Sequence, residues 1–295
     1  NGKEVRISKL ILTLALSEIF TSLWFTFFNT YLYQKVSGLC FNYLNYIMKN
    51  FILGLAVLST VLMKAQTQII AHRGYFQTQP PTTENSLKSL ENAQKLKVYG
   101  SEFDVRMTKD GVLVINHDEH HGKMEISETS FKELEQLKLS NGEKFPTLKD
   151  YLKQGKKDPS VKLIVEIKPA KTPEIENEIT KKTIQMIKDM KLESQSEFIS
   201  FSLNICREIK KQAPSFKVQY LNGELSPEQI RKEGLDGMDY HFSVFQKNPT
   251  WIAEAKALSL ITNSWTVNDV AVYEELKKQG IGFVTTNIPE QLKNK

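Results

Sequence analysis

Apolar and polar positions alternate in blocks along residues 66–295, and the blocks indicate strands and helices in turn. Short runs of mostly branched and aromatic residues predict β-strands, and longer segments with apolar residues at helical spacing predict the helices between most of them. The predicted strands are 68–73, 101–105, 112–117, 161–167, 197–201, 217–221, 259–265 and 282–286. The predicted helices are 84–97, 131–139, 147–154, 173–191, 204–212, 227–233, 249–257 and 270–279.

This alternation predicts a parallel sheet, because each helix carries the chain back to begin the next strand. About eight such repeats in roughly 230 residues fit a closed (β/α)8 barrel, the TIM barrel. Pro173, Pro227 and Pro249 stand near predicted helix starts, where a missing N–H costs nothing. An open doubly wound sheet is the alternative, but no glycine-rich dinucleotide loop follows any strand. Residues 66–295 contain no Ser/Gly linker, so we expect a single α/β domain.

The segment from Met48 onwards has the pattern of a secretory signal peptide. Lys49 is followed by an apolar run from Phe51 to Met63 and then by a small residue, Ala65. We therefore expect residues 48–65 to direct export to the periplasm or the medium, and residues 1–47 to be an over-extended or non-native leader. The alternative is a membrane anchor over residues 10–33, although Glu18 near its middle would be costly in lipid.

The excess of positive charge comes mainly from the N-terminal residues. The chain has 39 Lys and Arg against 34 Asp and Glu, but residues 1–65 hold six of these basic residues and two of the acidic ones. The remaining 33 basic and 32 acidic residues nearly cancel, so bulk charge predicts neither a nucleic acid nor an anionic membrane as partner. After signal cleavage we expect no stable membrane insertion. Of the two cysteines, Cys206 alone lies in the body, which excludes an internal disulfide there.

Carboxylates stand at the ends of two predicted strands. Glu102 and Asp104 are two residues apart on one strand, so their side chains point to the same face. Glu166, at the end of the next helix-separated strand, would complete a set of three oxygen ligands. Hard divalent ions such as Mg²⁺ and Ca²⁺ prefer such ligands, whereas zinc favours more His or Cys. The sequence therefore predicts a Ca²⁺ or Mg²⁺ site.

Histidines and basic residues end the same group of strands. His72 and His117 suit general acid–base catalysis, since imidazole titrates near neutral pH. Arg73 and Lys168 offer positive charge for phosphate oxygens. In a TIM barrel, function gathers at the carboxyl ends of the strands, where all these residues fall. The pattern predicts metal-assisted acid–base chemistry on a phosphate.

An ordered set of short motifs along the body resembles the glycerophosphodiester phosphodiesterase family. Each motif is weak alone, but the ordered set is specific and spans nearly all of residues 69–289. The motifs are H-R-G at 72–74, E-N at 84–85, E-x-D-V at 102–105, T-x-D-G at 108–111, H-D at 117–118, E-x-K at 166–168 and W-T-V-N at 265–268.

The resemblance implies a barrel that cleaves glycerophosphodiesters to sn-glycerol 3-phosphate and an alcohol with a divalent cation. It assigns the metal ligands and the two histidines as above, and phosphate binding to Arg73 and Lys168. It also implies that Trp265 flanks the glycerol or alcohol and that Glu84 and Asn85 support the metal site. The family often has T-D-x-P near the last strand, whereas this chain has Thr286, Asn287, Ile288 and Pro289. We expect this difference to touch none of the catalytic groups.

Two other functions stay open from the sequence. A phospholipase acting on intact phospholipids would share the architecture, although the near-neutral body and the lack of an evident amphipathic membrane helix argue against it. A non-catalytic phosphodiester-binding barrel would keep the pocket without turnover. The preferred alcohol, the choice between Ca²⁺ and Mg²⁺ and the oligomeric state are not predicted.

Overall fold

A computed structural model describes residues 46–49 and 66–295 of the chain. Residues 46–49 are helical, and residues 66–295 belong to one compact unit. The predicted leader, the candidate anchor at 10–33 and all of the signal peptide beyond residue 49 lie outside the described residues. No helix in the described ranges is long and apolar enough to cross a bilayer.

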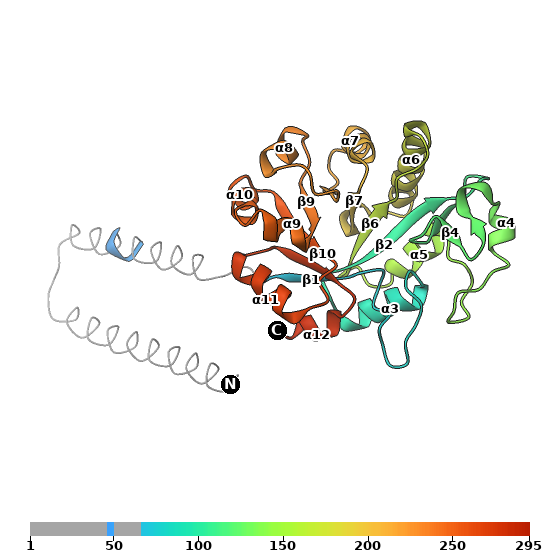
Figure 1. The fold of residues 1–295 in the computed structure, drawn as a ribbon, viewed down its shortest axis with the longest axis horizontal. Coiled ribbons are helices and arrows are strands. Elements are labelled where there is room, and N and C mark those ends of the chain that lie inside the picture. The colour runs from blue at the N-terminus through green and yellow to red at the C-terminus, as the bar shows by residue number, and fades with distance from the viewer. Residues whose placement is uncertain (1–45, 50–65) are drawn as a thin grey trace, which may run out of the picture. The chain divides into compact units, whose positions relative to one another are not determined.

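Within residues 66–295, eight parallel strands close into a barrel with helices around it, as predicted (Figure 1). The ring closes because β1 pairs with both β11 and β2. In order around the ring, the strands are β1 (Gln68–Ala71), β2 (Gly100–Met107), β6 (Lys162–Ile167), β7 (Ser196–Ser200), β8 (Val218–Tyr220), β9 (Gly237–His241), β10 (Ile261–Trp265) and β11 (Phe283–Thr286).

The helices between the strands begin where the sequence supplies caps. Thr172 caps α6 ahead of Pro173, and Ser226 caps α8 ahead of Pro227 through a capping box with Gln229. The helices of the barrel are α3 (Leu87–Leu96), α5 (Leu148–Gly155), α6 (Pro173–Asp189), α7 (Leu203–Gln212), α8 (Pro227–Lys232), α9 (Phe242–Lys247), α10 (Trp251–Ala257), α11 (Val270–Gln279) and α12 (Pro289–Lys293), with a 3₁₀ turn η2 (Glu193–Gln195) before β7.

Alternate residues of each strand face opposite sides, which separates a large outer core from a small inner one. Outward-facing side chains such as Phe103, Val165 and Tyr240 pack with the helices. The inner core is limited to the buried residues Ile70, Ile164, Ile199 and Leu221 with a few partly buried neighbours. Much of the remaining interior is polar, and this polar interior is where the site lies.

One predicted barrel strand is wrong. The run 112–117 forms β3 (Leu113–Ile115), which pairs antiparallel with β2 outside the closed ring. Its sequence resembles that of a barrel strand because it is apolar on both faces. Leu113 and Ile115 pack in the barrel core, whereas Val114 packs in the core of an insertion. The eighth barrel strand is β9, which was missed because its inward-facing residues, Asp239 and His241, are polar.

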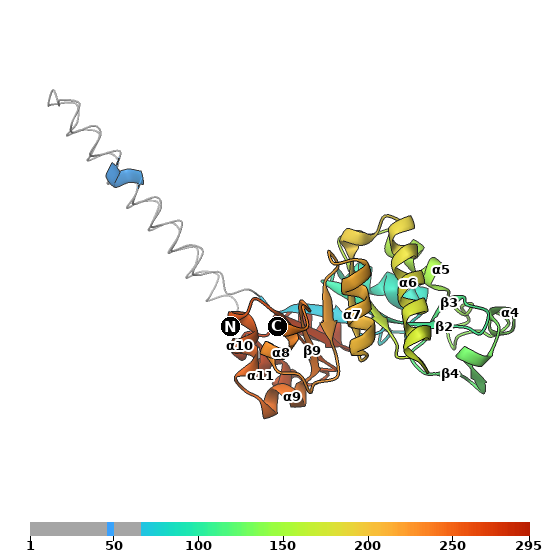
Figure 2. The ribbon, with the colours of Figure 1, turned by 90° about the horizontal axis from the view of Figure 1, so that it is seen from above.

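The insertion occupies residues 108–147 and lies to one side of the barrel (Figures 1 and 2). Its elements are β3, β4 (His120–His121), β5 (Met124–Glu125), η1 (Ile126–Glu128) and α4 (Phe131–Leu134). Its own small core contains Val114, Ile126, Leu134, Leu139 and Phe145. Lys171, in the loop after β6, ties it to the barrel through ion pairs with Glu125 and Glu128. The predicted helix 131–139 is shorter in the structure, where α4 ends at Leu134. Leu137 and Leu139 lie in the turns that follow and pack in the core of the insertion.

Candidate active site

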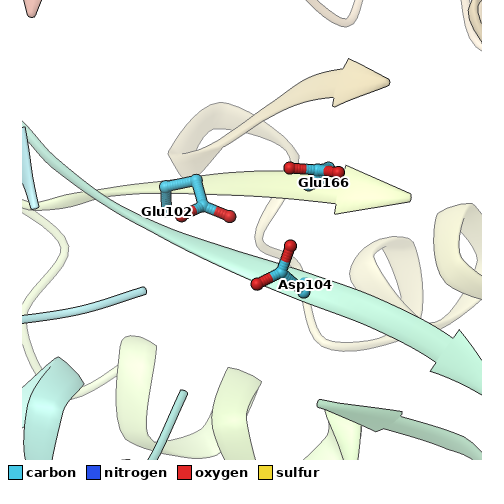
Figure 3. Close-up of side chains that lie close together, drawn as sticks. All are labelled: Glu102, Asp104 and Glu166. Carbon is cyan, nitrogen blue, oxygen red and sulfur yellow. The ribbon is translucent and has the colours of Figure 1, made fainter. Parts of the chain in front are cut away.

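Three carboxylates from two adjacent strands meet inside the barrel (Figure 3). Glu102 and Asp104 lie on β2, and the register of β2 against β6 sets Asp104 beside Glu166. One oxygen from each lies within 4.8 Å of the others, and all three residues are buried. The structure thus brings together the three residues that the sequence predicts as metal ligands.

Crowding of negative charge perturbs these carboxyls. Burial, followed by repulsion from Asp104 and Glu166, raises the pKa of Glu102 well above its usual range. Burial and Asp104 likewise raise the pKa of Glu166 to about 7. Burial would raise the pKa of Asp104 too, but Lys168 and His117 lower it to about 2. The cluster therefore holds more potential negative charge than its surroundings neutralise.

The donor set fits a hard divalent cation. All three candidate ligands are carboxylates, and Glu102 Oε1 is buried without a hydrogen-bond partner in the described part of the chain. Such orphaned oxygens are costly unless a donor or cation meets them. These residues would hold Ca²⁺ or Mg²⁺ in preference to zinc, which favours His and Cys.

Two basic side chains border the carboxylates. Lys168 Nζ lies 2.9 Å from Asp104 Oδ1 and 2.6 Å from Glu166 Oε1. Arg73 Nη1 lies 2.9 Å from Glu84 Oε1, and its Nε is 3.9 Å from Asp104 Oδ2. Both side chains also line the cavity, so each can bind an anion there while its carboxylate partners hold it in position.

A strained turn after β1 aims Arg73 and supports the carboxylates. Arg73 has a left-handed φ of +53°, and its N–H donates to Glu102 Oε2 at 2.8 Å. Gly74 follows at φ +78°, where a Cβ would lie only 2.3 Å from Ser89 Oγ. This close approach explains the glycine of H-R-G.

Glu84 and Asn85 lie before α3 rather than within the predicted helix 84–97, because Ser86 caps the helix and Asn85 has a left-handed φ of +56°. Asn85 Nδ2 donates to Asp104 Oδ2 at 2.7 Å, and Asn85 Oδ1 accepts from the Asp104 N–H. Glu84 contacts the cluster indirectly, through Arg73. Asn85 is thus the direct support of the carboxylates and Glu84 the indirect one.

His72 follows β1 and contacts a residue that we expected to be remote from the catalytic groups. Its Nδ1 lies 2.7 Å from Asn287 Oδ1, and its Nε2 lies 3.9 Å from Glu102 Oε2. The expectation that the Asn287 difference touches no catalytic group is therefore wrong. Burial, followed by the Arg73 charge, lowers the pKa of His72 to about 4, so the ring is neutral at pH 7.

His117 reaches the same cavity by an unexpected path. It follows β3, which runs back along β2, and the Asn116 N–H donates to the Asp104 carbonyl at 3.1 Å. Arg106 on β2 donates twice to the His117 carbonyl, at 3.0 and 2.8 Å. Asp118 Oδ1 lies 2.7 Å from His117 Nδ1. Burial lowers the pKa of His117, although Asp104 and Asp118 oppose this.

The support of His117 by Arg106 cannot be predicted from the sequence pattern, because it depends on the antiparallel pairing of β3 with β2. The cavity into which these groups face has a volume of about 190 Å³. Trp265 at the end of β10 lines it, with its indole N–H donating to the Asp239 carbonyl at 2.9 Å. Seven of the ten predicted site residues line this cavity, and two of them, Glu102 and Glu166, also belong to the acidic cluster. The other three, Asp104, Glu84 and Asn85, are not among the residues that line it.

Comparison with known proteins points to one family. A sequence model described as the glycerophosphoryl diester phosphodiesterase family matches residues 72–291. A glycerophosphodiester phosphodiesterase of Caldanaerobacter subterraneus subsp. tengcongensis is 30% identical over 246 residues, which are 78% of this chain and 97% of that protein.

Two solved structures extend the likeness to three dimensions. A glycerophosphodiester phosphodiesterase from Parabacteroides distasonis has 43% identity and a TM-score of 0.77, covering 78% of this chain and 96% of that one. An Oleispira antarctica phosphodiesterase, solved with its product sn-glycerol-3-phosphate, has 24% identity and a TM-score of 0.67 over 78% and 96% of the two chains. The second likeness shows the fold alone.

Proposed function

The chain belongs to the glycerophosphoryl diester phosphodiesterase family, and on that premise we propose that its barrel hydrolyses glycerophosphodiesters by cation-assisted catalysis with two histidines. One observation carries the mechanism: two histidines and three carboxylates, distant in sequence, converge on a single small cavity. The products would be sn-glycerol 3-phosphate and an alcohol. The Caldanaerobacter and Parabacteroides relatives, both named glycerophosphodiester phosphodiesterases, support this choice.

Glu102, Asp104 and Glu166 would hold the divalent cation, Ca²⁺ or Mg²⁺. When bound, such an ion offsets negative charge on phosphoryl oxygens. Arg73 and Lys168 would bind the same oxygens from the cavity wall, Arg73 with a planar fork and Lys168 as a point charge. Because both are already fixed by carboxylates, little reorganisation accompanies the reaction.

The histidine contacts favour separate roles. An amide oxygen at 2.7 Å accepts from His72 Nδ1–H, which leaves Nε2 unprotonated and able to remove a proton from the attacking oxygen. His117 has a carboxylate at Nδ1, which opposes the lowering of its pKa by burial and would stabilise its imidazolium form, so we assign to His117 the protonation of the departing alcohol. In this scheme the P–O bond to the alcohol breaks as the bond to the attacking oxygen forms. The attacking O–H group would lose its proton to His72 Nε2, and the departing alcohol oxygen would gain a proton from His117.

The cavity favours deacylated substrates over intact phospholipids. Its volume of about 190 Å³ lies below the roughly 300–1,000 Å³ typical of sites for drug-sized ligands. A phosphate with a small polyol fits such a space, whereas two acyl chains would have to remain outside it. We therefore place glycerophosphodiesters ahead of phospholipids as substrates.

The test is release of sn-glycerol 3-phosphate from diesters with several alcohols, measured beside release from phospholipid vesicles. We expect turnover of the soluble diesters, its loss in EDTA, and its return with Ca²⁺ or Mg²⁺. Faster turnover on vesicles would favour a phospholipase. Tight binding of diesters without any release would favour a binding barrel.

We also propose that the segment 48–65 directs export, on the strength of its charged start and apolar run. N-terminal sequencing of the protein recovered outside the cytoplasm tests this. A new N-terminus near residue 66 is expected, and retention of residues 10–33 in the membrane fraction would favour the anchor instead.

A further inference from the structure

Asp239 is a buried carboxyl that the mechanism above does not use. It lies on β9, the strand that the sequence pattern missed, and its side chain is aimed into the catalytic cavity, which it lines. The residue is 1% exposed, yet neither carboxyl oxygen has a hydrogen-bond partner among residues 66–295. Buried polar groups nearly always have a hydrogen-bond partner. An unpaired carboxyl that faces a ligand cavity is therefore a candidate to hydrogen-bond a group of the ligand.

Neighbouring side chains do not satisfy it. The register partner of Asp239 on β10 is Asn263, whose amide instead donates to Thr285 Oγ1 at 2.9 Å. Burial, followed by the charge of Glu166, raises the pKa of Asp239 well above its usual range. Asn263 opposes this rise only in part, and no Lys, Arg or His among residues 66–295 forms an ion pair with the carboxyl.

Asp239 is not a member of the acidic cluster. Among the described residues, the group whose oxygens lie within 4.8 Å of one another comprises Glu102, Asp104 and Glu166. In the order around the ring, three strands lie between β9 and β2 in either direction, so Asp239 stands on the wall opposite the carboxylates of β2. A phosphate held at the acidic cluster would have the rest of the substrate directed across the cavity toward β9.

We infer that Asp239 binds a hydroxyl group of the substrate's glycerol moiety and so determines specificity for a polyol over an aliphatic phosphate ester. This inference rests on the proposed function, because it assumes that phosphate binds at the acidic cluster. A hydroxyl both donates and accepts, so it pairs with a carboxyl in either protonation state. A site built around such a bond rejects an analogue that lacks the hydroxyl.

The decisive comparison uses a matched pair of substrates, glycerophosphocholine and propylphosphocholine, which differ by the two free hydroxyls. The full chain should prefer the glycerol diester in kcat/KM, and Asp239→Leu should reduce that preference by roughly 10- to 100-fold. Asp239→Asn keeps polar atoms in place and should retain part of the preference. An unchanged preference in Asp239→Leu would overturn the inference.

Binding gives a readout that does not depend on turnover. By calorimetry, the unaltered protein should bind sn-glycerol 3-phosphate more tightly than propyl phosphate, and Asp239→Leu should lose the difference. If this holds without turnover of any diester, the proposed function fails and the inference stands. If diesters are turned over and the binding difference survives Asp239→Leu, the inference fails and the proposed function stands.

Stability separates recognition from a structural role. Because Asp239 is unpaired, Asp239→Leu should raise the melting temperature of the ligand-free protein by about 2–4 °C. A carboxyl that served the fold would instead lower it on removal, and such a fall would count against the inference. Asp236→Asn is the matched control: Asp236 precedes β9 and pairs with Lys210 and Lys217, so its loss should leave the substrate preference unchanged.

Discussion

The two walls of the cavity are built differently. The acidic wall, formed by β2 and β6, carries Glu102, Asp104 and Glu166 with Lys168 set among them. The far wall, formed by β9 and β10, carries Asp239 and Trp265 and lies opposite in the strand order. On the acidic wall the carboxylates lie close to one another and to the Lys168 ammonium. On the far wall the Asp239 carboxyl has no hydrogen-bond partner among the described residues.

We attribute catalysis to the acidic wall and recognition of the substrate's polar group to the far wall. The crowded carboxyls of the acidic wall raise the pKa values of Glu102 and Glu166 and would be stabilised by a bound cation. Such shifted pKa values are typical of sites where catalysis depends on preorganised charges. The far wall has too few charges for that task, and its unpaired carboxyl and indole suit the recognition of a small polar group.

The largest effect should follow removal of either histidine beside the acidic wall. His72→Ala or His117→Ala should lower kcat for glycerophosphocholine by about 10²- to 10⁴-fold, because each supplies one proton transfer. Circular dichroism should show a retained fold. His120→Ala is the control, since that histidine lies in the β4–β5 hairpin of the insertion. Turnover like that of the unaltered protein in either His72→Ala or His117→Ala would reject their assignment.

Removal of Lys168 should unbalance the acidic wall. Lys168→Met leaves three buried carboxyls without their ammonium and should cost about 3–5 kcal/mol of unfolding free energy without added cation. Lys171→Ala, which breaks exposed ion pairs at the insertion, should cost at most about 1 kcal/mol. Urea unfolding of both variants measures the two losses of unfolding free energy. Equal losses would contradict the distinction between the buried ion pairs of Lys168 and the exposed ion pairs of Lys171.

The acidic wall should also impose a pH dependence on stability in the absence of divalent cations. Its carboxyls Glu102 and Glu166 have raised pKa values, so the folded state binds more protons than the unfolded state. Their contribution is therefore fully present below about pH 4.5 and is lost as the pH rises towards about 7, the folded value for Glu166. Unfolding free energies measured across this range in EDTA test the sign.

Added Ca²⁺ or Mg²⁺ should reverse that loss, because a bound cation favours the ionised carboxyls. The stabilisation by cation should thus grow between about pH 5 and pH 7. A cation effect that is constant over this range would show that Glu102 and Glu166 do not release protons on binding.

The smallest expected effect concerns Asn287. Asn287→Asp would place a carboxylate beside His72 Nδ1 and raise the pKa of that imidazole by about one unit or more. Since His72 must be neutral to accept a proton, the acidic limb of the pH–rate profile should move to higher pH. Asn294→Asp, at the exposed C-terminal end of α12, is the control and should leave the profile in place.

The sequence predicts the barrel fold and the convergence of the candidate site residues on one cavity, because these residues stand at strand ends. Glu102 and Asp104 share a face by their spacing, and the end of each parallel strand lies at one rim of the barrel. His117 was placed there for the wrong reason, since β3 is antiparallel to β2 and outside the ring.

What the sequence did not reveal depends on contacts between distant segments. Strand β9 was missed because Asp239 and His241 face the interior and interrupt its apolar pattern. The contact of Asn287 with His72 spans 215 positions, and the support of His117 by Arg106 depends on the turn between β2 and β3. Polar interiors and long-range pairs leave little periodic signal in a single chain.

Calorimetric titration of the protein with Ca²⁺ or Mg²⁺ tests the central claim, that the acidic wall holds a divalent cation and the far wall does not. We predict one bound cation per chain in the unaltered protein and in Asp239→Leu, and a large loss of affinity in Glu102→Gln and Glu166→Gln. Unchanged binding in both glutamine variants, or loss of binding in Asp239→Leu, would contradict the account.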